Sequence, residues 1–126
     1  MQEQTSLFTG RIRSFRHAFS GIWTMLRTQR NAWVHALATV AVILAGFVFG
    51  VSADEWCWLV LAMMAVWSAE ALNTALEFLA DAASPQFNPL IKNAKDIAAG
   101  AVLISATGSV VIGLLVLGPY VVNLVK

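Results

Sequence analysis

The chain contains the stretch Glu70-Ala-Leu-Asn73-Thr-Ala-Leu-Glu77-Phe-Leu-Ala-Asp81, in which polar residues interrupt an otherwise apolar run. The four numbered residues follow one another at i, i+3, i+7 and i+11, so in a helix they form one narrow polar stripe. A carboxylate near the centre of a bilayer costs roughly 2.5–3.5 kcal/mol, so ionisable residues within a span are candidates for function. We therefore expect this polar stripe to carry the chemistry.

The composition indicates a membrane protein. Hydrophobic residues make up 59% and charged residues 12% of the 126 residues, against roughly 45–50% and about 25% in soluble domains. Such a chain is neither disordered nor a disulfide scaffold, and the single cysteine leaves no cysteine-based zinc site. We expect one domain covering residues 1–126.

Three apolar stretches, at residues 32–51, 56–79 and 97–117, are each long enough to span a bilayer as a helix. Gly118-Pro119 is expected to bend or end the last of them. Residues 8–30 predict a basic amphipathic helix that lies in the membrane interface or packs on the other helices. The predicted fold class is an all-α membrane protein with an N-terminal amphipathic interfacial helix and three transmembrane helices.

The distribution of positive charge predicts the orientation. Five arginines lie between residues 11 and 30, and the connection between the second and third spans carries Lys92 and Lys95. The connection between the first two spans is short and acidic, with Asp54 and Glu55. Because positively charged segments stay on the cytoplasmic side, the N-terminus is expected inside and the C-terminus outside.

Two kinds of chemistry suit the polar stripe. Carboxylates together with an amide oxygen can bind Mg²⁺, and a further carboxylate can act as a general base. Alternatively, Glu70 and Glu77 can relay protons or bind Na⁺ in a small ion-conducting protein. His35, in the first span, is expected to make a hydrogen bond between helices rather than to act as a catalyst.

Lys95 and Asp96 stand where the third spanning helix is expected to begin. A lysine beside a helix N-terminus attracts phosphate oxygens, because the free N–H groups and the helix dipole add to its charge. The pair can equally be an ordinary interfacial ion pair that caps the helix. No nucleotide-binding glycine motif accompanies these residues.

The polar stripe, Pro89-Leu90 and Ala94-Lys95-Asp96-Ile-Ala-Ala-Gly-Ala-Val-Leu103 together resemble the signature of the prokaryotic diacylglycerol kinase family, which includes undecaprenol kinases. The resemblance implies a homotrimeric lipid kinase of the bacterial inner membrane, with no nucleic-acid partner. It also implies transfer of the γ-phosphoryl group of ATP, with Mg²⁺, to the hydroxyl of undecaprenol or diacylglycerol. The stretches around Asn88 and Lys95 resemble undecaprenol kinases more closely.

The resemblance also implies roles for individual residues. Glu70 matches the catalytic base, and Glu77 matches a ligand of Mg²⁺ and of the ATP phosphates, with Asn73 beside it. Lys95 and Asp96 match a pair near the nucleotide phosphates, which Asp81 supports. The remaining positions match contacts of the nucleotide: Arg11, His17, Gln86, Phe87 and Asn88.

The chain departs from the family pattern at two positions. Gln29, in the run Thr28-Gln29-Arg30-Asn31, stands where many members have a glutamate that binds the metal. Its carbonyl can still coordinate, but the site loses one negative charge, so we expect weaker binding of Mg²⁺. Asn88 stands where many members have histidine, which changes the contact with the nucleotide base. A catalytically inactive relative is the remaining alternative.

Overall fold

The computed structural model describes residues 2–126, with side chains from Thr9 onward, and this part of the chain consists of four helices without a strand. They are α1 (Gln2–Thr28), α2 (Arg30–Phe49), α3 (Ala53–Ala83) and α4 (Pro89–Val125). The last three are long and apolar enough to cross a membrane. The predicted fold class is therefore confirmed.

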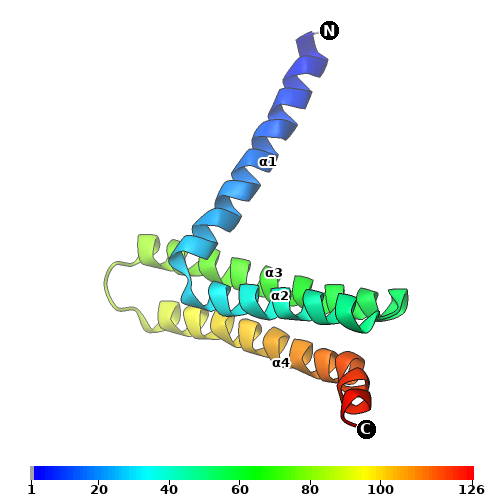
Figure 1. Ribbon diagram of the computed structural model, residues 1–126. Helices are drawn as coiled ribbons and strands as arrows, with labels where there is room; N and C mark the ends of the chain where they lie inside the picture. Colours follow the sequence, from blue (N-terminus) through cyan, green and yellow to red (C-terminus); the bar gives the residue numbers. More distant parts are fainter. Residues whose placement is uncertain (1) are drawn as a thin grey trace.

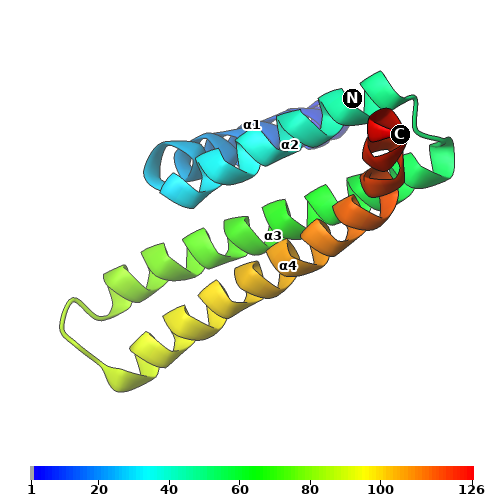
Figure 2. The same ribbon diagram turned by 60° about the horizontal axis from the view of Figure 1, so that its bottom comes forward.

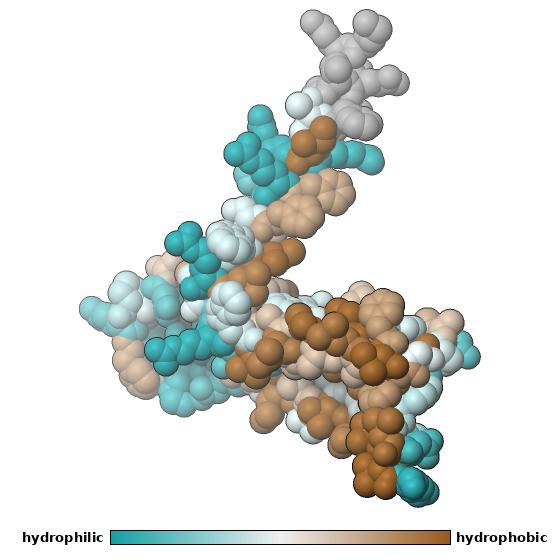
Figure 3. Space-filling view, viewed as in Figure 1, coloured by the Kyte–Doolittle hydropathy of each residue, from teal (hydrophilic) through white to brown (hydrophobic). Residues whose placement is uncertain are grey.

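α2, α3 and α4 run side by side (Figures 1 and 2), whereas α1 leaves the bundle at a steep angle (Figure 1). Met25, near the end of α1, is buried, but Phe15 and Phe19 are 68% and 70% exposed. In the space-filling view, α1 carries apolar side chains along one side and polar ones along the other (Figure 3). Within one chain most of the apolar face of α1 is uncovered, as an interfacial helix requires.

The third spanning helix is longer at both ends than the apolar stretch 97–117 that predicted it. α4 already begins at Pro89, because the side chain of Asn88 accepts a hydrogen bond from the N–H of Leu90 (2.9 Å) and proline suits the first turn. Pro119 lies inside α4, which continues to Val125. Gly118-Pro119 thus bends the helix without ending it, and Figure 1 shows the deflected last turns.

The turn between α2 and α3 is tightly capped. Gly50 adopts the left-handed conformation (φ 63°), and the N–H of Val51 reaches the carbonyl of Gly46 (3.1 Å). Ser52 and Glu55 then form a capping box at the start of α3. Because this turn is short and rigid, it fixes the position of α3 along α2.

The helix lengths show that α3 extends beyond α2 at one end of the bundle. α2 has 20 residues and is about 30 Å long, which equals the thickness of the hydrocarbon core. α3 has 31 residues and is about 46 Å long. Since α2 ends and α3 begins at the same short turn, the C-terminal end of α3 extends past the N-terminal end of α2. The beginning of α4 lies at this extended end of the bundle (Figure 1).

Candidate active site

The polar stripe of α3 runs from the interior of the bundle to its exposed end. The side chain of Glu70 is 1% exposed and Asn73 is 6% exposed, whereas Glu77 is half-buried. Asp81, near the end of the helix, has a side chain that is 71% exposed. Along one helix face the polar side chains thus pass from an enclosed environment to an open one.

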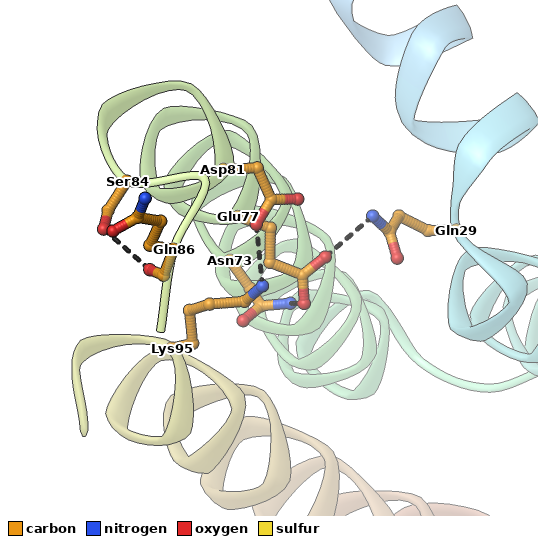
Figure 4. Close-up of polar contacts among 7 residues, drawn as sticks. All are labelled: Gln29, Asn73, Glu77, Asp81, Ser84, Gln86 and Lys95. Carbon is orange, nitrogen blue, oxygen red and sulfur yellow. Dashed lines mark hydrogen bonds and ion pairs between the residues drawn. The ribbon is translucent and has the colours of Figure 1, made fainter. Parts of the chain in front are cut away.

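Glu77 is the centre of a cluster of amides (Figure 4). The Nε2 of Gln29 donates to Oε2 of Glu77 at 3.0 Å, and the Nδ2 of Asn73 donates to Oε1 at 3.4 Å. Gln29 stands directly before α2, so this contact marks the level on α3 at which α2 begins. The structure therefore brings together the three residues that the sequence assigned to the metal.

The oxygen atoms of this cluster suit Mg²⁺. Glu77 supplies a carboxylate, and Gln29 has a carbonyl oxygen. Oδ1 of Asn73 is buried and has no hydrogen-bond partner among the described side chains and backbone. Mg²⁺ is usually held by one or two carboxylates together with substrate phosphates and water. Among the residues from Thr9 onward, no group of three or more His, Cys, Asp or Glu side chains could hold a metal. The cluster therefore fits an ion shared with phosphates rather than a closed protein cage.

Lys95 reaches from α4 toward the polar stripe (Figure 4), and its Nζ lies 3.0 Å from Oδ1 of Asp81. Asp96 instead pairs with Lys92 on the same helix, at 2.6 Å. Lys95 and Asp96 lie in the second turn of α4, which begins at Pro89. The prediction that they stand at the helix N-terminus is therefore wrong, and the lysine faces carboxylates rather than free N–H groups.

The predicted nucleotide contacts are spread over two other segments. In the loop after α3, the backbone oxygen of Gln86 accepts from Ser84 Oγ (2.9 Å), Phe87 is 82% exposed, and the side chain of Asn88 caps α4. Arg11 and His17 are exposed on α1, the helix that leaves the bundle (Figure 1). Within one described chain, no hydrogen bond or ion pair joins Arg11 or His17 to the polar stripe.

Glu70 has a neighbour that sequence reasoning did not pair with it. Nε2 of His35 lies 3.5 Å from Oε2 of Glu70. Both carboxylate oxygens and this nitrogen are buried, and none of them has a hydrogen-bond partner in the described part of the chain. The two residues are distant in sequence, so no local pattern joins them. The sequence could have indicated this contact through depth in the membrane. His35 follows Gln29 by about two helical turns, and Glu70 precedes Glu77 by about the same distance, so His35 and Glu70 are expected at similar depth.

The chain is similar to proteins of known function. The sequence model of the prokaryotic diacylglycerol kinase family matches residues 16–117. The chain belongs to this family. It is 45% identical over 107 residues to the undecaprenol kinase of Bacillus subtilis, a match covering 85% of this chain and 87% of that protein. It is 40% identical over 112 residues to a diacylglycerol kinase of Synechocystis, covering 88% of this chain and 64% of that protein.

Membership of the prokaryotic diacylglycerol kinase family identifies the chain as a membrane lipid kinase. A kinase of this family takes its phosphoryl group from ATP and passes it to a lipid. Nothing in the comparisons favours the ion-conducting alternative for Glu70 and Glu77. The resemblance that the polar stripe and the Lys95 segment suggested is confirmed.

Proposed function

We propose that this protein is an ATP- and Mg²⁺-dependent undecaprenol kinase in which Glu70 is the catalytic base. The observation that carries the proposal is the position of its carboxylate, which is 1% exposed and has no hydrogen-bond donor among the residues that the structure describes. Glu70 lies two turns, or about 10 Å, further into the membrane than Glu77, which stands at the level where α2 begins. A base at this depth can meet the hydroxyl of a lipid without lifting the lipid into water.

The proposed reaction balances as a direct transfer. The acceptor's O–H bond breaks and its proton passes to the carboxylate of Glu70. The acceptor oxygen forms a bond to the γ-phosphorus of ATP, while the bond between that phosphorus and the bridging oxygen breaks. ADP leaves, and the lipid becomes its monophosphate. Because such a transfer depends mainly on positioning and neutralisation of charge, the residues around Glu77 determine the rate as much as the base does.

Glu77, Asn73 and Gln29 are proposed to hold the metal at the phosphates. Mg²⁺, when bound, neutralises negative charge on the phosphoryl oxygens. The Nζ of Lys95 faces the same region (Figure 4) and supplies a further positive charge, which Asp81 holds in place. We propose Asp96 and residues 86–88, which border this end of the bundle, as the further contacts of the nucleotide.

Undecaprenol fits the depth of Glu70 better than diacylglycerol does. A polyprenol has one hydroxyl on an apolar chain, so it can sink to Glu70 without burying another polar group. Diacylglycerol carries two ester groups beside its hydroxyl, and burying these without hydrogen bonds costs free energy. The match to the undecaprenol kinase also has the higher identity and spans more of the relative's length. Diacylglycerol remains the second candidate acceptor.

We also propose a homotrimer in the bacterial inner membrane, with the N-terminus and the α3–α4 connection in the cytoplasm. The arginines before α2 and the lysines early in α4 support this orientation. The path of α1 away from the bundle supports the assembly, because Arg11 and His17 can then approach the polar stripe of a neighbouring copy. Sites built between subunits would also enclose Asp81 and Lys95, which one chain leaves accessible.

Transfer of labelled γ-phosphate by the purified protein in mixed micelles tests the proposal. Undecaprenol and diacylglycerol are offered in parallel with Mg-ATP, and the Glu70→Gln variant is the control. We expect label in undecaprenol and its loss in the variant. Label in diacylglycerol alone would show that diacylglycerol, not undecaprenol, is the acceptor. Equal label with the wild type and with Glu70→Gln would show that Glu70 is not the catalytic base.

A further inference from the structure

His35 is the polar side chain that the described part of the chain places at the carboxylate of Glu70. Its Nε2 lies 3.5 Å from Oε2, slightly beyond hydrogen-bonding distance. The other polar side chains nearby have different partners. Thr74 Oγ1 donates to the backbone oxygen of Glu70 (2.8 Å), and the amide of Asn73 donates to Glu77.

The imidazole of His35 is held in place by a second pair of side chains. The ring of Trp67 stands edge-on to it, with centroids 6.4 Å apart and planes at 71°. The indole Nε1 of Trp67 in turn donates to Thr39 Oγ1 at 2.9 Å. Trp67 lies on α3 and Thr39 on α2, so the same two helices that carry His35 and Glu70 also fix the orientation of the ring.

We propose that His35 is a positioning residue for Glu70, donating its Nε2–H to one carboxylate oxygen and leaving the other to take the acceptor's proton. This inference rests on the proposed function, in which Glu70 is the base. A buried carboxylate without a donor lacks the hydrogen bonds that water would supply, which costs free energy and leaves its orientation unfixed. A donor at one oxygen therefore offsets part of this cost and fixes the direction in which the other oxygen points.

Three substitutions of His35 separate positioning from packing. Gln places an amide nitrogen near the position of Nε2, Asn places it near Nδ1, and Leu has no donor. We expect His35→Leu and His35→Asn to lower kcat by about 10- to 100-fold, the range for a hydrogen bond to a charged group, with the KM for ATP unchanged. His35→Gln should recover most of the loss. Equal losses in all three variants, or none, would overturn the proposal.

A second measurement does not depend on activity. A hydrophobic carbodiimide reacts at an oxygen of a buried carboxyl group, so a hydrogen bond to that oxygen slows the reaction, and mass spectrometry gives the rate of labelling at Glu70. We expect several-fold faster labelling in His35→Leu than in the wild type, with His35→Gln close to the wild type. An unchanged rate would overturn the pairing. If the rate rises while the wild type phosphorylates neither lipid, the proposed function fails and the pairing of His35 with Glu70 stands.

Discussion

Replacing Gln29 by glutamate should raise the affinity for Mg²⁺ and lower the stability of the metal-free protein. In the structure the amide of Gln29 donates to Glu77 at 3.0 Å. The substitution removes this donor and puts a second carboxylate beside the first. Without metal, the variant loses a hydrogen bond to a charged group and gains a like-charge contact, which together cost roughly 2–4 kcal/mol.

With Mg²⁺ bound, the added carboxylate becomes a ligand instead of a repelling neighbour. Two unit charges about 4 Å apart interact by about 1 kcal/mol in water, so one added charge gains about 2 kcal/mol with a divalent ion. That corresponds to about 30-fold in affinity. The concentration of free Mg²⁺ that gives half-maximal phosphoryl transfer should therefore fall by about that factor, at constant Mg-ATP.

The assay pairs a titration of free Mg²⁺ with thermal unfolding in detergent, with and without the ion. Gln29→Met is the matched control, because it also loses the donor but adds no charge. It should lose stability without metal and gain no affinity for Mg²⁺. If Gln29→Glu leaves the Mg²⁺ dependence unchanged, or shifts it as Gln29→Met does, then Gln29 does not stand at the metal and the assignment of Glu77 as its ligand fails with it.

Three further outcomes follow from single contacts. Gly46→Ala should lower the melting temperature by an amount equivalent to about 1–3 kcal/mol, since an added Cβ would lie 2.5 Å from the ring of Trp56; an unchanged melting temperature would contradict that close approach. Lys95→Met should raise the KM for ATP by about tenfold or more, and Lys95→Arg should restore part of it, whereas equal KM values would remove Lys95 from the phosphate site. Asn88→Ala should destabilise the protein by about 1 kcal/mol through loss of the α4 cap, while Asn88→Ser should not; equal unfolding curves for the two variants would exclude the cap.

The elements with a regular pattern were predictable from the sequence. Apolar runs longer than 18 residues have few structural solutions, so α2, α3 and α4 follow from length and composition. The stripe of Glu70, Asn73, Glu77 and Asp81 follows from helical spacing alone. Hydropathy does not predict the start of α4, because the helix begins at Pro89, directly after the Asn88 cap and eight residues before the apolar run.

Contacts between helices could not be predicted from the spacing of residues within one helix. Lys95 and Asp96 are adjacent in sequence, which suggests that they act at one place. On a helix, however, neighbouring side chains point in different directions. Lys95 consequently faces Asp81 on α3, while Asp96 meets Lys92 one turn away. The contact of His35 with Glu70 likewise depends on how α2 and α3 are aligned, which a pattern within one helix does not report.

The alignment of α2 with α3 makes the polar stripe depend on the turn at the opposite end of the bundle. From Gln29 to His35 is six residues, or about 9 Å along a helix, and from Glu77 back to Glu70 is seven, or about 10 Å. Because these distances match, Gln29, at the N-cap of α2, can donate its amide to Glu77 while His35, within α2, lies beside Glu70. The match holds only while the turn at Gly50 and Ser52 keeps α2 and α3 in register. The capped turn at the far end of the bundle therefore sets the geometry of a site about 30 Å away.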